Sequence, residues 1–330
     1  MRVVIYEWCM SGGLAGGDAA IAREGRMMLE ALAADAAADP AIEVDVLVEE
    51  GRDVDVPARG RVVPVPIGAA GAALIAAARA ADWSVIVAPE TDGILAALVA
   101  STRRAGGRVV APTGRVIEIA ADKQATIDAL AARGVPVPAG RPLAAGVRVP
   151  PGFRMPAVRK HRTGCGGDGF EVLGAHDGPA AGHPARIEAF AAGTPVGVSC
   201  ICGTPATIVL PPMRQSFDAG RSLRYLGGDL LADGQLAARA IELARRAAAA
   251  MGADAGWLGV DMILGPRPDG RDDRVLEVNP RVTTSFVGLA RLFSSSLVAT
   301  MIGAATGAAK PPVPVASPDP TRAGFRVPGG

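Results

Sequence analysis

The sequence predicts an α/β fold in which a parallel-sheet domain comes first and two mixed α+β units follow it. Strand-like and helix-like segments alternate through residues 1–113, which favours parallel strands covered by helices. Residues 114–190 carry fewer helical signals and a run of glycines, as in a small α+β unit. Alternating strands and a long helix return in residues 191–308. A length of 330 residues fits two or three domains of ordinary size.

The elements of the first domain are bounded by apolar runs and by glycine, serine and proline. The opening apolar run ends at Ser11-Gly12-Gly13, so we expect a first strand that leads into a loop. Asp18 is a suitable N-cap for the helix after that loop. The expected strands are 2–8, 43–48, 62–65, 84–88 and 108–111, and the expected helices are 18–37, 69–81 and 92–105.

The middle unit is expected to hold one clear helix, 122–133, which Gly134 and Pro136 end. A proline-rich connection then leads to strands at 156–162 and 170–173, with a glycine loop between them. In the third unit the expected strands are 196–202, 207–210, 259–264 and 274–278, and the expected helices are 235–251, 285–293 and 295–305. Residues 309–330 are rich in proline and glycine, and we expect a tail that lacks a core.

Composition excludes several classes of protein. The net charge of +1 argues against a nucleic-acid binder, which normally carries a basic face. The apolar stretch 68–81 is interrupted by Arg79, so it is too short to span a membrane. Four cysteines in 330 residues are too few for a disulfide scaffold, which favours a reducing, cytoplasmic location. The oligomeric state stays open, with a homodimer as one option.

Lysine is rare in this chain, and its placement is informative. Lysine supplies only three of the 34 basic residues, at Lys123, Lys160 and Lys310. Lys123 opens the helix after Asp122, where a cation is unfavourable, so an anionic partner is indicated. The alternative is a surface lysine that pairs with Asp122 or Glu118. Lys160 lies on the strand before the glycine loop and suits phosphate oxygens, whereas Lys310 lies in the tail as a solvated charge.

The glycine loop Gly164–Gly169 matches the pattern G-x-G-x-x-G. In a dinucleotide-binding motif this pattern follows a strand and opens a helix, because the helix N-terminus holds the pyrophosphate. Here an apolar strand follows the loop, and no helix is expected. The loop can instead cover phosphates with its backbone N–H groups. An ordinary glycine hairpin is the alternative.

The strands 259–264 and 274–281 carry the strongest chemical signal. A turn rich in proline, glycine and aspartate joins them, so a hairpin is expected. Strand side chains alternate between faces, which places Glu277 and Asn279 on one face and Asp261 roughly opposite Glu277. Facing carboxylates need a neutralising partner, and hard oxygen ligands suit magnesium. A solvent-exposed acidic face is the alternative, which the apolar neighbours of these residues disfavour.

These motifs together resemble the ATP-grasp enzymes, over roughly residues 1–306. The resemblance implies a Rossmann-like pre-ATP-grasp domain over 1–113, an ATP-binding lid over 114–190 and a C-terminal unit with the metal site over 191–308. It also implies ATP and two Mg²⁺ ions, for which Mn²⁺ can substitute. The motifs that carry it are Asp122-Lys123, Lys160, Gly164–Gly169, Glu188-Ala189-Phe190, Asp261 and Glu277-Val278-Asn279-Pro280-Arg281.

The resemblance carries the roles of the family to matching positions. The implied ATP contacts are Lys123, Lys160, Gly166, Gly167, Gly169, Glu188 and Phe190, and the implied metal ligands are Asp261, Glu277 and Asn279. The usual second acidic residue of the adenine linker is Ala189 here, so that contact would come from Glu188 or from the backbone. Arg281, together with Lys160, is the candidate to stabilise the transferring phosphoryl group or the tetrahedral oxyanion.

Three further segments resemble the tyramine–glutamate ligase branch of this family. They are Tyr6-Glu7 with Ser11-Gly12-Gly13, Ala88-Pro89-Glu90-Thr91, and the run from Asn279 to Gly288. This likeness implies a ligase of methylofuran-type cofactor biosynthesis that joins the γ-carboxylate of glutamate to tyramine or a related amine, both small-molecule substrates. The expected substrate contacts are Ser11, Gly12, Gly13, Thr283, Thr284 and Ser285.

Two other functions remain compatible with these residues. A phosphotransferase on the same fold would leave the phosphate on its substrate, and a nucleotide-binding regulatory protein would turn nothing over. Among the few aromatic residues, Trp8, Phe217, Tyr225 and Trp257 are candidates for an amine pocket, although each also suits the core. Cys200 and Cys202 are expected to be buried structural residues.

Overall fold

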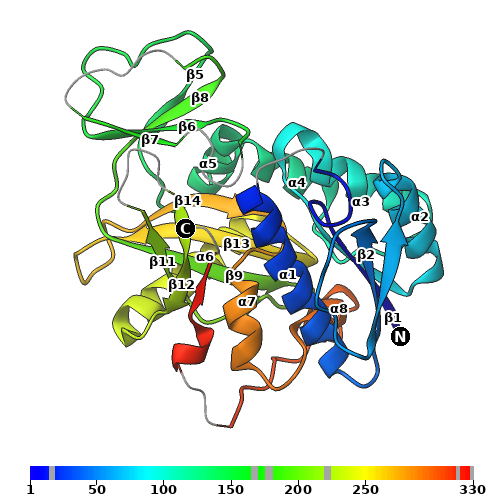
Figure 1. Ribbon diagram of the computed structural model, residues 1–330. Helices are drawn as coiled ribbons and strands as arrows, with labels where there is room; N and C mark the ends of the chain where they lie inside the picture. Colours follow the sequence, from blue (N-terminus) through cyan, green and yellow to red (C-terminus); the bar gives the residue numbers. More distant parts are fainter. Residues whose placement is uncertain (15–18, 165–169, 175–180, 219–223, 317–319, 328–330) are drawn as a thin grey trace.

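The computed structural model describes residues 1–14, 19–164, 170–174, 181–218, 224–316 and 320–327. Two sheets and their helices form the body of the molecule, and a small third sheet stands away from it (Figure 1). Within the described residues, no helix is long and apolar enough to cross a membrane.

The N-terminal sheet is parallel, as the sequence predicts, with strand order β3-β2-β1-β4. Its strands are β1 (Arg2–Glu7), β2 (Glu43–Glu49), β3 (Gly60–Val65) and β4 (Trp83–Val87). Its helical elements are α1 (Ala19–Ala38), α2 (Ala70–Ala80), η1 (Thr91–Gly93) and α3 (Ile94–Arg104). The strand expected at 108–111 is wrong: it is reduced to one bridge between Ser84 and Val109. Pro112 follows at once and has no N–H with which to extend the pairing.

The small sheet is antiparallel, with strand order β5-β8-β6-β7. Its strands are β5 (Gly140–Leu143), β6 (Ala157–His161), β7 (Glu171–Leu173) and β8 (Ala185–Ala189), and the helices α4 (Gly114–Ala121) and α5 (Lys123–Ala131) precede it. Its core is small and centres on Leu143, Ala157 and Ile187. This sheet, together with α4 and α5, is called the lid below and spans residues 114–189.

The large sheet has the order β14-β13-β9-β11-β12-β15, with the short β10 paired to β9. Its strands are β9 (Thr194–Cys202), β10 (Ile208–Val209), β11 (Met213–Phe217), β12 (Tyr225–Leu230), β13 (Gly256–Leu264), β14 (Arg274–Asn279) and β15 (Phe325–Arg326). Its helical elements are α6 (Gly234–Met251), α7 (Phe286–Leu289), η2 (Ala290–Leu292), α8 (Leu297–Ala305) and η3 (Pro320–Ala323). Cys200 and Cys202 are buried on β9, as predicted.

The expectation that the C-terminal segment lacks a core is wrong for residues 320–327. β15 pairs with β12 at the edge of the large sheet, the short red strand of Figure 1. Phe325 is buried and packs against Tyr225, with their ring centroids 6.3 Å apart. Gly227 makes this approach possible, because a Cβ there would lie 2.1 Å from the Phe325 carbonyl oxygen.

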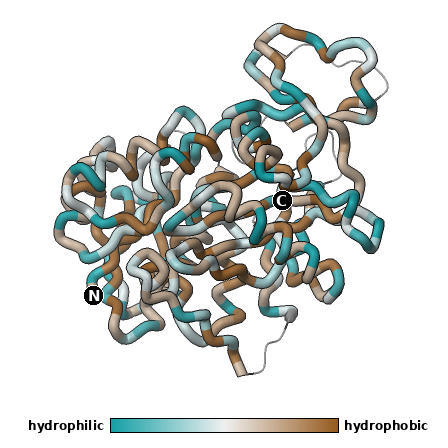
Figure 2. The backbone as a smooth tube through the Cα atoms, turned by 180° about the vertical axis from the view of Figure 1, so that it is seen from behind, coloured by the Kyte–Doolittle hydropathy of each residue, from teal (hydrophilic) through white to brown (hydrophobic). Residues whose placement is uncertain are grey.

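The N-terminal and large sheets share one hydrophobic core rather than forming separate bodies. Val46 of β2, Leu32 of α1, Phe286 of α7 and Met301 of α8 belong to the same buried cluster. A second buried cluster lies between α6 and the large sheet and includes Ala244 of α6 and Val260 of β13. Hydrophobic residues follow the central strands in Figure 2. The shared core therefore fixes α1 relative to the end of β14.

Candidate active site

The hairpin of β13 and β14 has the register that the sequence predicts. Asp261 lies opposite Glu277, and Gly259 lies opposite Asn279. The Asn279 amide Nδ2 donates to Asp261 Oδ2 at 2.9 Å. Two carboxylates and an amide therefore meet on one face of the hairpin.

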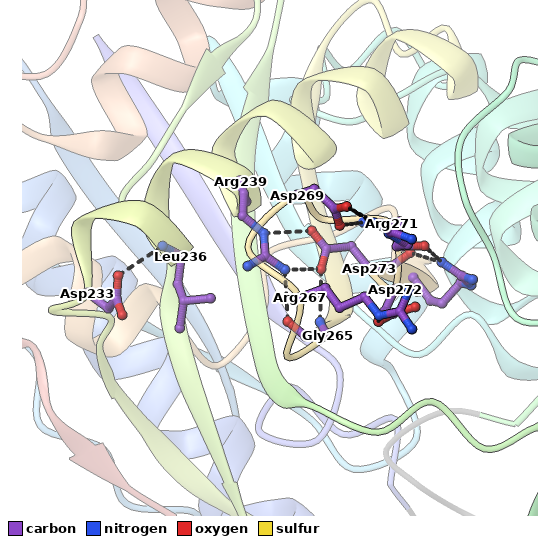
Figure 3. A network of polar contacts seen from close by, with 10 residues as sticks. Asp233, Leu236, Arg239, Gly265, Arg267, Asp269, Arg271, Asp272 and Asp273 are labelled. Atoms are coloured by element: carbon purple, nitrogen blue, oxygen red, sulfur yellow. Dashed lines mark hydrogen bonds and ion pairs between the residues drawn. The ribbon is translucent and has the colours of Figure 1, made fainter.

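The turn of this hairpin is fixed by a polar network with α6 (Figure 3). Asp273 is buried, and its Oδ1 accepts from the backbone N–H of Gly265 at 2.8 Å. The Arg239 guanidinium donates to Asp273 from Nε at 3.1 Å and to the Gly265 carbonyl at 2.9 Å. Because the turn is held at both ends, the register of Asp261 and Glu277 is defined by side chains outside the site.

Gln215 of β11 adds a contact that the sequence analysis missed. Its Nε2 donates to Asp261 Oδ1 at 2.7 Å across the intervening strand β9. The strand leaves room for this because Gly197 lies between them: a Cβ there would be 3.1 Å from Gln215 Nε2 and 3.3 Å from Asp261 Oδ1. Both Asp261 oxygens thus accept from side-chain amides, which fix the orientation of the carboxylate.

The two carboxyl groups have opposite pKa shifts. Burial, and next the charge of Glu277, raise the pKa of Asp261 to about 6. Burial would also raise the pKa of Glu277, but the charges of Lys123 and Lys160 lower it below its ordinary value. A divalent cation between the two groups would relieve their repulsion, and their oxygen donors fit Mg²⁺.

Lys123 reaches the hairpin from the N-terminus of α5. It is buried, and its Nζ lies 3.2 Å from Glu277 Oε1 and also donates to the Gly164 carbonyl. In the part of the chain that the structure describes, Lys123 pairs with neither Asp122 nor Glu118, the alternative partners, and Asp122 caps α5 and binds Arg162 instead. The structure therefore brings Lys123 from the lid segment to the acidic hairpin.

Lys160 lies on the lid sheet and is also buried. Its Nζ forms an ion pair with Glu188 Oε1. Arg186, another residue that the sequence analysis missed, lies 3.2 Å from Glu188 Oε2 and donates to the Pro138 carbonyl. The Glu188 side chain is thus held by two cations. Phe190, two positions further along the chain, is 44 % exposed and lines the cavity described below.

The glycine loop is only partly described. Gly166, Gly167 and Gly169 lie outside the described residues, so their expected contacts with phosphate stay predictions. β6 and β7 flank the loop as an antiparallel pair. A strand rather than a helix therefore follows the loop, and the dinucleotide-binding interpretation is wrong.

Arg281 and the hydroxyl run follow β14 directly. Arg281 Nε lies 2.9 Å from Glu90 Oε1, at the end of the N-terminal sheet. The Ser285 hydroxyl is 2.9 Å from the Thr283 hydroxyl and 3.0 Å from that of Ser199. The segment therefore joins the first domain to the large sheet.

The loop after β1 has a different environment. The Ser11 hydroxyl is buried and donates to the Leu47 carbonyl at 2.7 Å. Trp8 covers Gly13, where a Cβ would lie 2.0 Å from the indole nitrogen. Ser11, Gly12 and Gly13 are absent from the residues that line the cavity described below. Their expected contact with substrate is not supported by this placement, because the Ser11 hydroxyl already has a partner inside the fold.

A cavity of about 530 Å³ unites the remaining residues. The predicted site residues that line it are Lys123, Lys160, Glu188, Phe190, Asp261, Glu277, Asn279, Arg281, Thr283, Thr284 and Ser285. Glu24 of α1, Gln215, Phe217 and Tyr225 are among the other residues that line it. Trp257 lies in the core instead. Lys123 and Lys160 thus face the acidic hairpin across one space, in which the lysines suit anionic groups and the oxygen donors of the hairpin suit a divalent cation.

Comparisons with known proteins agree with this arrangement. The model of the ATP-grasp domain matches residues 120–285, and that of the pre ATP-grasp 3 domain matches residues 54–117. The chain belongs to the ATP-grasp family. A comparison with curated proteins found no match.

Solved structures share the fold at low identity. An ATP-grasp superfamily protein from Archaeoglobus fulgidus has a TM-score of 0.71 at 21% identity, covering 92% of this chain and 89% of its own. D-alanine–D-alanine ligase from Bacillus anthracis, complexed with ATP, gives 0.60 at 16% identity, with coverage of 92% and 97%. L-amino acid ligase from Bacillus licheniformis gives 0.62 at 12% identity, with coverage of 93% and 75%. The likeness extends over nearly the whole chain.

Proposed function

We propose that this protein is an ATP-dependent carboxylate–amine ligase. The observation that carries the proposal is that Lys123 and Lys160 line the same cavity as the face formed by Asp261, Glu277 and Asn279. Cations suit the phosphates of ATP, and the oxygen ligands suit the metal that accompanies them. Two of the structural neighbours are named as amino-acid ligases, which favours amide formation within this family.

The reaction has two steps. A carboxylate oxygen of the acid attacks the γ-phosphorus of ATP, and the bond to the β–γ bridging oxygen breaks to give an acyl phosphate and ADP. The amine nitrogen then attacks the acyl carbon, inorganic phosphate leaves with the electrons of the C–O bond, and the nitrogen loses a proton. The product is an amide, and the sum consumes one ATP for each C–N bond.

The residues of this chain bind and orient the reactants rather than react covalently. Lys123 and Lys160 would hold the phosphates. Asp261, Glu277 and Asn279 would hold two Mg²⁺ ions, or Mn²⁺ in their place, which would neutralise charge on the phosphates. Arg281, kept in place by Glu90, would stabilise the transferring phosphoryl group and the oxyanion that forms in the second step.

For the substrates, we propose the γ-carboxylate of glutamate and tyramine or a close relative, in a methylofuran-type pathway. The resemblance of the run from Asn279 to Gly288 supports this choice. The hydroxyls of Thr283 and Ser285 lie on the cavity wall beside Arg281, which suits a small polar acid. The loop at Ser11 does not contribute to this argument.

The test uses purified enzyme, ATP, Mg²⁺ and glutamate with either hydroxylamine or tyramine. Hydroxamate together with ADP supports the acyl phosphate, and a γ-linked amide of tyramine supports the substrates. ADP with a stable phosphorylated substrate and no need for a nucleophile would identify a phosphotransferase. No ADP release in a screen of acids and amines would instead indicate a nucleotide-binding protein without turnover. Amides with other acids, but not with glutamate, would discard the substrates and keep the ligase chemistry.

A further inference from the structure

Glu24 is a carboxylate of the cavity wall that the family resemblance does not account for. It projects from α1 of the N-terminal domain, and its Oε1 accepts a hydrogen bond from the Thr284 hydroxyl. Glu188 and Glu277 each form an ion pair with a lysine. Among the residues that the structure describes, Glu24 has no such cationic partner. Its negative charge is therefore available to a cation that enters the cavity.

Aromatic side chains line the cavity near this carboxylate. The rings of Phe217 and Tyr225 have centroids 5.7 Å apart, and both residues contribute to the cavity wall. Burial first, and then the charges of Asp261 and Glu24, raise the pKa of Tyr225, so its hydroxyl keeps its proton. The influence of Glu24 on this pKa agrees with the placement of both residues on the wall of one cavity. Aromatic residues make up only 4% of the chain, so this pairing in one cavity is notable.

We propose that Glu24, Tyr225 and Phe217 form the subsite for the acceptor, an aromatic primary amine bound as its ammonium ion. This inference rests on the proposed ligase function. A carboxylate without a cation binds an ammonium group, while the two rings offer apolar area and an attractive face to a cation. Thr284 fixes Glu24 to the loop that also carries Arg281, so the amine is held beside the site where the acyl group forms.

The reacting carboxylate of the acid does not suit this position. That group is an anion and would be repelled by Glu24, whereas Arg281 and the neighbouring hydroxyls attract it. If the acid is an amino acid, its own ammonium group is the competing occupant. The experiment below separates the two occupants by replacing the aromatic amine with hydroxylamine, which is small and uncharged near neutral pH.

The decisive variant is Glu24→Gln, because the amide oxygen can still accept from Thr284 while the charge is lost. We expect the KM for tyramine to rise about 10-fold or more, as for the loss of one charge-assisted contact. The KM for glutamate in the hydroxylamine assay should change by less than about 2-fold, well below that loss. Glu242→Gln is the matched control, since Glu242 is an exposed carboxylate on α6 and should change neither constant.

Two kinetic outcomes would overturn the assignment. An unchanged KM for tyramine in Glu24→Gln would show that the charge of Glu24 does not bind the acceptor. A larger rise in the KM for glutamate than for tyramine would assign Glu24 to the ammonium group of the acid. Glu24→Asp keeps the charge on a shorter side chain, and we expect it to restore part of the affinity for tyramine.

A binding measurement tests the subsite without turnover. Calorimetric titration compares tyramine with 4-ethylphenol, which has the same ring but no ammonium group. The wild-type protein should prefer tyramine by about 10-fold, and Glu24→Gln should lose this preference. Phe217→Ala should weaken both ligands alike. No preference in the wild type would overturn the subsite, whereas a Glu24-dependent preference without any ADP release would refute the ligase and keep the subsite.

Discussion

The ends of β1 and β14 carry similar residues but have opposite environments. β1 ends at Glu7, and a loop with a serine at position 11 follows. β14 carries Glu277 near its end, and a loop with Ser285 follows. From the sequence, both loops are candidates for substrate binding. In the structure only the segment after β14 lines the cavity.

At the end of β1 the polar groups are satisfied locally. Glu7 is 3 % exposed, and its carboxylate accepts from the backbone N–H of Met10 at 2.8 Å. α1 lies directly over it, because a Cβ at Gly25 would be 2.6 Å from Glu7 Oε2. Burial raises the pKa of Glu7 to about 7, despite hydrogen bonds from the turn that oppose the shift.

At the end of β14 the carboxylate is kept charged by residues distant in the sequence. Lys123 comes from α5, and Lys160 comes from the lid sheet, and together they lower the pKa of Glu277. The charge of Arg281 lowers the pKa of both carboxyl groups, but of the two only Glu277 also has lysines nearby among the described residues, so the lysines account for the difference. The loop residues that follow do not decide this.

Among the substitutions that test this contrast, we expect Glu277→Gln to have the largest effect on activity. If Glu277 is a metal ligand, as proposed, its loss should reduce ADP formation about 100- to 1,000-fold, the usual cost of losing an electrostatic contact in the transition state. Chelation of the metal should have a similar effect on the wild type. The control is Glu43→Gln, an exposed carboxylate on β2. Full activity in Glu277→Gln, with the thermal transition preserved, would remove Glu277 from the metal site.

Glu7→Gln tests the opposite end of the comparison through stability. The pKa of the Glu7 carboxyl is about 7 in the folded protein, against 4.5 for a glutamate in an unfolded chain, so its ionisation opposes folding. The wild type should therefore lose stability as the pH rises from 4.5 through 7, by up to about 3 kcal/mol. Glu7→Gln has no such proton to release.

The measurement is chemical denaturation of both proteins at pH 5 and pH 8. The free energy of unfolding of the wild type should fall between these values by more than that of Glu7→Gln. Parallel changes in the two proteins would show that Glu7 ionises as easily in the fold as in the unfolded chain. The conclusion that burial at the end of β1 raises the pKa of Glu7 would then be wrong.

Lys160→Ala tests the cation supplied by the lid. The KM for ATP should rise about 10- to 150-fold, because one charge-assisted contact with phosphate is lost. Lys310→Ala is the control, since Lys310 is exposed after α8 and is not among the residues that line the cavity. Equal effects of the two substitutions on the KM for ATP would contradict the role given to Lys160.

The sequence predicted the parts of the site that depend on local order. The alternation in the two strands and the turn between them were enough to place Asp261 opposite Glu277. The scarcity of lysine in the chain made Lys123 and Lys160 candidates for binding an anion. Gln215 and Glu24 were missed because each contacts the site through a partner that lies 46 or 260 positions away in the chain. No periodicity or spacing within one segment reports such contacts.

The sequence also did not predict which polar groups are buried. Ser11 precedes two glycines and Ser285 follows two threonines, and neither local pattern tells which hydroxyl lies inside the fold and which lines a cavity. The difference comes from β2, whose Leu47 carbonyl accepts from Ser11, and from β9, whose Ser199 contacts Ser285. The segment 320–327 was misjudged for the same reason, because its packing depends on β12.

The smallest expected effect compares these two serines directly. Ser285→Ala should raise the KM for the acid about 5- to 10-fold, since one hydroxyl of the cavity wall and its contacts with Thr283 and Ser199 are lost. Ser11→Ala should leave the KM for the acid within about 2-fold but lower the free energy of unfolding by about 1 kcal/mol, because the Leu47 carbonyl loses its buried donor. Both constants are measured in the hydroxylamine assay, and stability is measured by denaturation. The reverse pattern would be a higher KM for the acid in Ser11→Ala and an unchanged KM in Ser285→Ala. It would assign the acid to the loop after β1. The cations opposite Glu277 would then mark the nucleotide half of the site alone, and the acid would have to bind at the end of the parallel sheet.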